Sequence, residues 1–163
     1  MKPVRILTTG GTLDKVHNWR EENITFAGAG KSQVPEVLEH GRCYFPEIEQ
    51  LFQIDSLDMT ESYRTLLLER VKAAKENALV ITHGTSTMAE TARFIDGQTE
   101  DKTVVLTGAM RPYSLFVSDA SFNLGGAIIA AQTLPAGVYG VMNGQVFPAS
   151  DLRKNEKLGR FDA

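Results

Sequence analysis

Two short segments of the chain combine glycine with threonine in a way that suits nucleophilic chemistry. They read Gly11-Thr12 and Gly84-Thr85, and each follows a run of apolar and β-branched residues. Glycine lets the backbone approach a ligand closely and adopt a positive φ. The hydroxyl that follows can act as a nucleophile, and the backbone N–H groups beside it can stabilise an oxyanion. One such pair is an ordinary turn with a helix cap. Two pairs at facing strand ends weaken that interpretation and leave an active site as the alternative to it.

A nucleophilic threonine needs a partner elsewhere in the chain, because a hydroxyl attacks at neutral pH only beside a base or a cation. The charged side chains that could serve are Asp14, Lys15, Asp58 and Lys154. A lysine can act as a base only when burial or neighbouring charges lower its pKa. The sequence leaves the choice among these four open.

Strands and helices are expected to alternate along the chain. Apolar or β-branched runs predict strands over residues 4–9, 48–54, 78–82 and 102–107, and helical spacing predicts helices over 35–38, 60–77, 87–95 and 120–132. Residues 137–142 and 144–146 predict a hairpin over Asn143-Gly144, a favoured turn pair. Because the strands are apolar throughout, we predict a three-layer α/β fold with a mostly parallel sheet and helices on both faces.

The segment after the first strand and the start of the third helix carry further local signals. Residues 13–32 are polar, contain glycine and show no clear period, which predicts a long loop. Thr87 and Glu90 have the spacing of a capping box. In open parallel sheets ligands bind beyond the carboxyl ends of the strands, so we expect the chemistry in the segments directly after them.

The charge and length of the chain exclude several classes of protein. With 17 Lys+Arg against 20 Asp+Glu, the net charge is −3, which gives no electrostatic footprint for nucleic acid or an anionic membrane. No apolar run is long enough to span a bilayer, and no signal-peptide core follows Met1. The lone Cys43 cannot form an internal disulfide. We therefore predict one globular domain, residues 1–163, in the cytoplasm.

The histidines give no sign of a metal site. His17, His40 and His83 lack the spacing of metal ligands, so we expect no metal. His83 ends a predicted buried strand, where we expect a structural histidine whose ring nitrogens are both hydrogen-bonded.

Four ordered blocks resemble the bacterial-type asparaginase/glutaminase family. The similarity runs from Val4 to about Phe161 and covers the N-terminal domain of the family, about half its usual length, which implies a Rossmann- or flavodoxin-like fold. The Thr-Leu-Asp-Lys continuation is similar to that of short single-domain relatives. The blocks are Thr8-Thr9-Gly10-Gly11-Thr12-Leu13, His83 to Ala92, Leu106 to Pro112 with Ser118-Asp119 and Phe122-Asn123-Leu124, and Asp151-Leu152-Arg153-Lys154-Asn155.

The resemblance implies cofactor-free hydrolysis of the side-chain amide of L-asparagine to aspartate and ammonia by a homo-oligomer. Thr12 would attack the amide carbon and form an acyl-enzyme that water then hydrolyses. Thr85 would be the second essential hydroxyl, with Lys154 as its proton partner. The implied substrate contacts are Gly11, Ser56 on the α-carboxylate, Leu57, Ser86, and Ala109, whose carbonyl would lie near the leaving ammonia.

Three positions depart from the family's pattern. Ser86 stands where the family has an aspartate for the substrate's α-ammonium, and Leu57 stands where a glutamine helps to grip the α-carboxylate. The loop after Thr12 lacks the family's tyrosine, and Ile24 falls near its expected place. We expect Asp14 or Asp58 to replace the missing acidic contacts.

These departures leave three interpretations of the function. The first is a threonine-dependent amidohydrolase that acts on L-asparagine, and the second is an amidohydrolase that acts on another amide. The third is a small-molecule-binding domain that keeps the two threonines but has lost catalysis. A carboxylate near a bound amine would favour the first interpretation, because a buried ammonium needs a partner.

Overall fold

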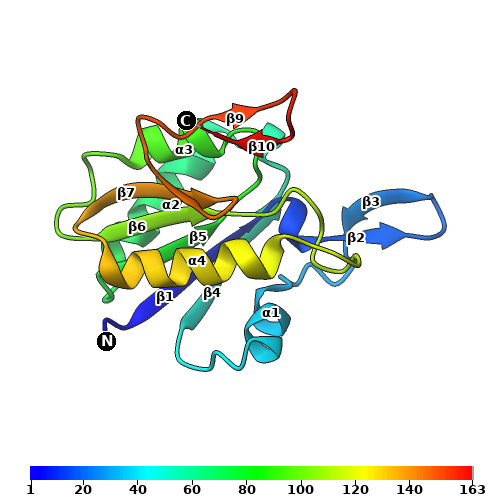
Figure 1. The fold of residues 1–163 in the computed structure, drawn as a ribbon, viewed down its shortest axis with the longest axis horizontal. Helices are drawn as coiled ribbons and strands as arrows, with labels where there is room; N and C mark the ends of the chain where they lie inside the picture. Colours follow the sequence, from blue (N-terminus) through cyan, green and yellow to red (C-terminus); the bar gives the residue numbers. More distant parts are fainter. Residues whose placement is uncertain (163) are drawn as a thin grey trace.

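A computed structural model describes residues 1–162, and its centre is a six-stranded sheet (Figure 1). Five strands run parallel and the last, β8, runs antiparallel to β7. Counted in chain order, the parallel strands follow the order 2-1-3-4-5 of flavodoxin-like sheets. The strands, in their order across the sheet, are β4 (Glu47–Ile54), β1 (Val4–Gly10), β5 (Ala78–Thr82), β6 (Thr103–Thr107), β7 (Gly137–Met142) and β8 (Gln145–Pro148).

Four helices cover the two faces of this sheet, which confirms the predicted three-layer α/β fold. Helices α1 (Val34–His40) and α4 (Ala120–Thr133) pack on one face, and α2 (Glu61–Ala73) and α3 (Met88–Ile95) on the other (Figure 1). Successive residues of β5 serve opposite faces, with Val80 in the first core and Ile81 in the second. Both faces are therefore apolar, which is why the strand reads as a continuous apolar run.

The predicted hairpin at the end of the sheet is confirmed. Strands β7 and β8 are joined by Asn143 and Gly144, which have φ angles of +54° and +76°. Asparagine and glycine tolerate this left-handed region, and two such residues make the turn whose twist matches the strands.

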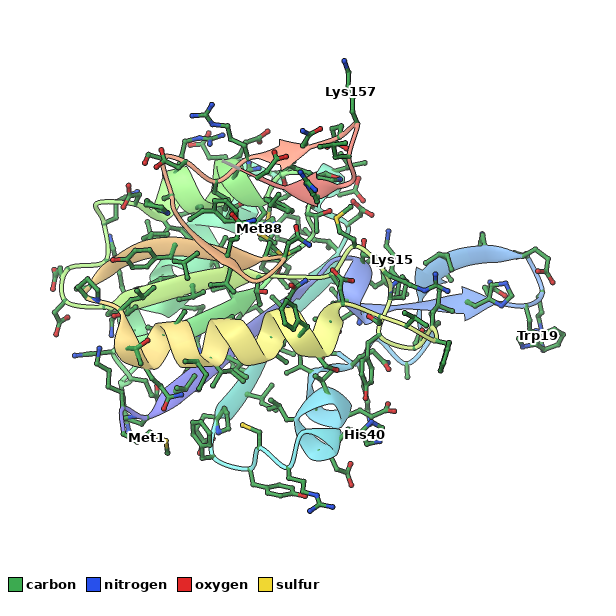
Figure 2. All side chains as sticks on the ribbon, in the orientation of Figure 1. Met1, Lys15, Trp19, His40, Met88 and Lys157 are labelled. Atoms are coloured by element: carbon green, nitrogen blue, oxygen red, sulfur yellow. The ribbon has the colours of Figure 1, made fainter. Side chains whose placement is uncertain are left out.

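The predicted loop over residues 13–32 is wrong in part. The chain forms a 3₁₀ turn, η1 (Thr12–Asp14), and then an antiparallel hairpin of β2 (Lys15–Asn18) and β3 (Asn23–Phe26). The hairpin projects from the body, with Trp19 near its far end (Figures 1 and 2). Each strand has only four residues and none of them is buried, so the brief alternation of β3 was too short to indicate a strand in the sequence.

One predicted helix end and one predicted helix cap also need correction. Helix α2 ends at Ala73 rather than at residue 77, and the ammonium of Lys102 donates to the carbonyls of Ala74 and Glu76 that follow. Helix α3 does start after Thr87, but the predicted capping box is absent, because the Thr87 hydroxyl donates to the Ser56 carbonyl at 2.7 Å. The Glu90 carboxylate instead accepts from Arg64.

The last segment of the chain forms a short hairpin above α3. Its two strands, β9 (Lys154–Asn155) and β10 (Arg160–Phe161), pair antiparallel, and Lys157 lies in the turn between them (Figure 2). Phe161 is fully buried in the core beneath, so it anchors this hairpin to the body. Within residues 1–162, none of the helices combines the length and the apolar character needed to cross a membrane.

Candidate active site

The carboxyl ends of β4, β1 and β5 are packed backbone against backbone. A Cβ atom on Gly11 would lie 2.4 Å from the backbone nitrogen of Gly84, and one on Gly84 would lie 2.5 Å from the Ser56 hydroxyl oxygen. Gly11 has φ 80° and ψ −176°, a region that only glycine populates readily. The structure therefore brings Gly11, Ser56 and Gly84 together where the strand order reverses, which is the crevice that binds ligands in open α/β sheets.

Thr12 is the first residue after this contact and is half-buried. The turn that carries it is tied on two sides, because the Gly11 N–H donates to the Ile54 carbonyl at 3.0 Å and the Tyr113 N–H donates to the Leu13 carbonyl at 3.2 Å. The first bond fixes the turn to β4 and the second to the loop after β6. These two bonds fix the backbone of the turn that carries Thr12 beside the crevice.

Thr85, Ser86 and Lys154 line one hollow of about 320 Å³. Thr85 and Ser86 come from the turn before α3, and Lys154 comes from β9. The ammonium of Lys154 lies 3.2 Å from the Glu156 carboxylate, and its side chain is only 15% exposed. The structure therefore brings together a predicted hydroxyl and its predicted proton partner from distant parts of the sequence.

Three charged residues of this hollow were missed by the sequence reasoning. They are Glu90, Arg93 and Glu156, and a fourth, Arg153, lies beside the predicted Lys154. Glu90 and Arg93 lie on the exposed side of α3, and Glu156 lies two residues after Lys154. In the sequence Glu90 is interpreted as part of a capping box and the others as ordinary surface charges, so only the folded arrangement could identify them.

Ala109 is fully buried in the loop after β6, next to the end of β5. A Cβ atom on Gly108 would lie 2.3 Å from the His83 carbonyl oxygen. The Asp119 carboxylate accepts from the backbone N–H groups of Met110 and Arg111 at 3.0 to 3.1 Å. The loop that carries Ala109 is therefore fixed in place by a side chain rather than by a strand.

Asp14 is buried rather than placed in a solvated turn. One carboxylate oxygen accepts from the Ser32 hydroxyl at 2.8 Å and from the Gln33 N–H at 2.7 Å, and the other has no partner. Burial raises the pKa of Asp14, although these two bonds oppose that shift. The contacts tie the Thr12 turn to the start of α1, which makes Asp14 an anchor of the crevice wall.

Seven predicted site residues do not line the hollow: Gly11, Thr12, Asp14, Ser56, Ala109, Leu57 and Asp58. Leu57 and Asp58 differ from the others in their exposure. Both are exposed on a 3₁₀ turn, η2 (Ser56–Asp58), that follows β4. Lys15 pairs with the Asp55 carboxylate. Burial alone would raise the pKa of Asp55, but the Leu57 N–H and the Lys15 ammonium together hold it below its usual value. Lys15 is thus already engaged by a carboxylate.

His83 is fully buried at the end of β5, as predicted, but only one of its ring nitrogens is paired. Nδ1 lies 2.8 Å from the Gly84 carbonyl oxygen, and Nε2 has no hydrogen-bond partner. Burial lowers the pKa of His83 to about 4, so the ring is neutral at pH 7. Since a carbonyl can only accept, Nδ1 carries the proton.

This buried imidazole predicts a pH-dependent stability. The unfolded chain binds a proton near pH 6.5 and the folded chain only near pH 4, so the free energy of unfolding falls as the pH drops through that window. We expect a loss of roughly 3 kcal/mol between pH 7 and pH 4 from this one group. Urea unfolding of the wild type and His83→Gln at both pH values measures it, and parallel losses in the two proteins would show that His83 is not responsible.

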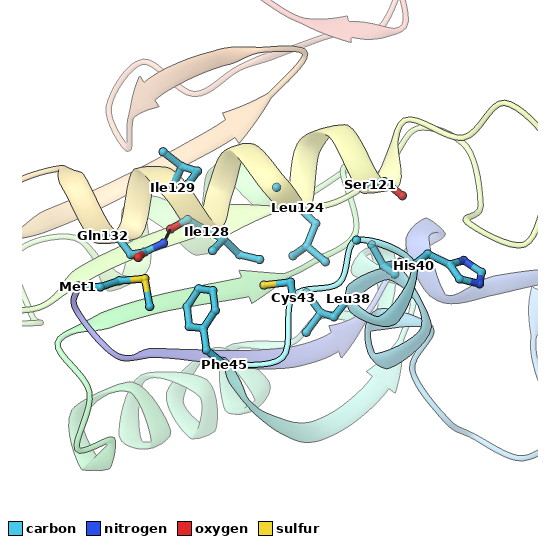
Figure 3. A pocket seen from close by; sticks show the side chains of 13 residues that line it. Met1, Leu38, His40, Cys43, Phe45, Ser121, Leu124, Ile128, Ile129 and Gln132 are labelled. Carbon is cyan, nitrogen blue, oxygen red and sulfur yellow. Dashed lines mark hydrogen bonds between the residues drawn. The ribbon is translucent and has the colours of Figure 1, made fainter.

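A second, more apolar hollow of about 490 Å³ lies between α1 and α4, away from the strand ends (Figure 3). Leu38, Cys43, Phe45, Leu124 and Ile128 line it. It contains none of the predicted site residues, and its few polar groups do not converge on a point. Its lining therefore offers apolar surface rather than the chemistry of the crevice.

No group of three His, Cys, Asp or Glu side chains within residues 1–162 is arranged to hold a metal ion. The chemistry available at the crevice is that of the hydroxyls, the Lys154 ammonium, the carboxylates of the hollow and the backbone groups.

Comparison with known proteins gives a family match over almost the whole chain. The model of the asparaginase N-terminal domain matches residues 3–163. L-asparaginase 2 of Escherichia coli (strain K12) is 34% identical over 162 residues, which cover 93% of this chain and 46% of that protein.

Two further relatives carry other names. A glutaminase-asparaginase of Acinetobacter glutaminasificans is 32% identical over 93% of this chain and 49% of its own length. A glutamyl-tRNA(Gln) amidotransferase subunit of Methanococcus vannielii is 31% identical over 90% of this chain and 35% of its own length. The chain thus spans about half the length of the curated relatives it matches, or less.

Proposed function

Because the chain belongs to the asparaginase family, we propose that its crevice hydrolyses the side-chain amide of L-asparagine to aspartate and ammonia. The observation that carries this proposal is the arrangement of the two glycine-threonine turns. Gly11 and Gly84 touch, so the threonines that follow them flank one point at the switch in strand order. The names of the relatives refer to asparaginase, glutaminase and amidotransferase, all of which act on amides.

Thr12 serves as the nucleophile in this proposal. Its hydroxyl oxygen attacks the amide carbon, the C–N bond breaks, and ammonia leaves with the proton that the hydroxyl gives up. The resulting ester is hydrolysed by water, which releases the carboxylate and returns a proton to Thr12. A carboxamide is a poor electrophile, so the fixed backbone around Thr12 contributes by holding the reacting atoms in place.

Thr85 and Lys154 form the second part of the machinery. The Lys154 amine receives a proton by way of the Thr85 hydroxyl. For this its ammonium, which pairs with Glu156 at 3.2 Å, must first pass a proton to that carboxylate. Ser56 contacts the substrate's α-carboxylate, and the Ala109 carbonyl faces the departing ammonia. Glu90 and Glu156 are the carboxylates of the hollow beside Ser86. They pair with Arg64 and Lys154, and one of them exchanges that partner for the bound α-ammonium.

The proposal is tested by measuring ammonia release from L-asparagine, L-glutamine, D-asparagine and simple amides, with Thr12→Ala as the control. We expect release from L-asparagine that is absent in the control. Release from another amide instead would support an amidohydrolase of different specificity. A folded protein that releases ammonia from none of them would overturn the proposal in favour of a small-molecule-binding domain.

Ser86→Asp is expected to improve the binding of L-asparagine. The new carboxylate lies in the hollow with Lys154, where it can pair with the substrate's α-ammonium. A hydrogen bond between charged groups contributes about 1.5 to 3 kcal/mol when it is shielded from water. Because residue 86 is exposed, we expect the low end of this range, which corresponds to a fall in KM of about tenfold.

The matched control uses succinamate, which is L-asparagine without its amino group. Its KM should not fall in Ser86→Asp, because it has no ammonium for the new carboxylate. Equal changes for both substrates would place the α-ammonium away from residue 86. The homo-oligomer and the cytoplasmic location remain predictions from the sequence.

A further inference from the structure

A continuous line of hydrogen bonds joins the loop of Ala109 to the segment of Lys154. The amide nitrogen of Asn123, on α4, donates to the Gly108 carbonyl at 3.0 Å, and its amide oxygen accepts from the backbone N–H of Asn143 at 3.0 Å. The side-chain oxygen of Asn143 accepts in turn from the backbone N–H of Phe161 at 2.8 Å. Phe161 lies directly opposite Lys154 in the β9–β10 pair.

The middle of this line is a buried amide with both ends satisfied. Asn123 is fully buried, and its nitrogen also donates to the Asp119 carboxylate at 2.9 Å. That same carboxylate holds the N–H groups of Met110 and Arg111. A buried polar network whose members are all paired is rigid, because breaking any bond leaves an unpaired group away from water.

The β9–β10 hairpin, which carries Lys154, depends on these hydrogen bonds more than the Ala109 loop does. The β9–β10 pair has only two residues in each strand. A hairpin of this size does not hold its shape by itself in water. It is fixed to the body by the buried Phe161 ring and by the bond from Phe161 to Asn143. The buried ring sets how far β10 lies within the core. The backbone bond sets the position of β10, the strand opposite Lys154, relative to Asn143.

We propose that Asn143 is a positioning residue that fixes the place of Lys154 relative to the Ala109 loop. It contacts Asn123 on the side of that loop and Phe161 on the side of Lys154. The inference rests on the proposed function for the roles of Lys154 and Ala109. Neither asparagine lines the hollow, so both act through the groups they hold. A displacement of about 1 Å far from the reacting atoms can cost about a hundredfold in rate.

The turn allows a sharp test at Asn143. Its φ of +54° suits glycine, aspartate and asparagine alike, so Asn143→Gly removes only the side-chain acceptor and Asn143→Asp restores one. The backbone bond from residue 143 to Asn123 survives in both variants. The two proteins are compared with the wild type, as full chains, in steady-state ammonia release from L-asparagine and in hydrogen exchange of the Phe161 amide.

We expect Asn143→Gly to lower kcat by about tenfold to a hundredfold while KM changes less than threefold, and Asn143→Asp to recover most of the rate. The Phe161 amide should exchange faster in the glycine variant alone. Unchanged exchange in Asn143→Gly overturns the link, and faster exchange with unchanged kcat overturns the positioning role. If the wild type releases no ammonia, the proposed function fails, and the role of Asn143 in it fails as well. The exchange of the Phe161 amide still decides whether Asn143 fixes the hairpin.

Discussion

Thr12→Ala is expected to lower amide hydrolysis by about 10,000-fold or more while the protein stays folded. Removing the nucleophile of a covalent mechanism removes the step itself, and what remains is the weak assistance of the surrounding dipoles. The side chain is half-buried and its turn is held by backbone bonds from Gly11 and Tyr113, so the free energy of unfolding should change by about 1 kcal/mol or less. Ammonia release and urea unfolding measure the two effects.

Thr12→Ser is the matched control, because it removes a methyl group and keeps the hydroxyl. It should retain activity within about a hundredfold of the wild type, far above the alanine variant. If alanine and serine at position 12 give equal rates, the nucleophile is another group, and Thr85 at the facing turn becomes the first candidate. Rapid quenching with labelled substrate should also trap an ester on wild-type protein and none on Thr12→Ala.

The strand ends could be predicted from the sequence because their signals are local. A buried parallel strand is a continuous apolar run, and the glycine that ends it marks the place where two backbones meet. Gly11 and Gly84 therefore stand out in the sequence, and the structure places them in contact. The same local logic identified the Asn143-Gly144 turn, because few residues tolerate two successive positive φ angles.

What the sequence did not reveal depends on contacts between distant segments. Thr87 and Glu90 have the spacing of a capping box, yet Ser56 and Arg64 compete successfully for their side chains. Nothing near Asp14 in the chain indicates that it becomes buried against Ser32. Local pairing preferences are worth about 1 kcal/mol, so a tertiary partner of similar strength decides the outcome.

The line from Asn123 to Lys154 shows the same limit at the site. Asn123 belongs to a block that resembles the family, but its partner Asn143 and the partner of Asn143, Phe161, carry no motif that links them to it. Asn143 reads in the sequence only as a turn residue, a role it does have. Its second role depends on where the β9–β10 pair lies, and the buried Phe161 ring and the bond from the Phe161 N–H together decide that.

Gly11→Ala is expected to destabilise the fold by about 3 kcal/mol or more and to abolish activity. An alanine must adopt φ 80° and ψ −176°, which costs about 1 to 3 kcal/mol for a residue with a Cβ. Its Cβ would also lie 2.4 Å from the nitrogen and 2.6 Å from the Cα of Gly84. These are backbone atoms of a buried strand end, so β1 and β5 must separate at the point where Thr12 and Thr85 begin.

Gly97→Ala is the control, because Gly97 also has a positive φ, +75°, but a Cβ there would meet nothing within 4 Å. We expect that variant to lose about 1 kcal/mol of stability and to keep its activity, since only backbone strain is added. Urea unfolding and ammonia release of both variants distinguish the effect of backbone strain at a positive φ from the effect of the clash with Gly84. Equal stability losses would mean that the ends of β1 and β5 can move apart at little cost in free energy. A crevice formed by such mobile strand ends could not hold Thr12 rigidly. If Gly11→Ala does not fold while Gly97→Ala does, the contact between the two turns is a condition of the fold as well as of the site.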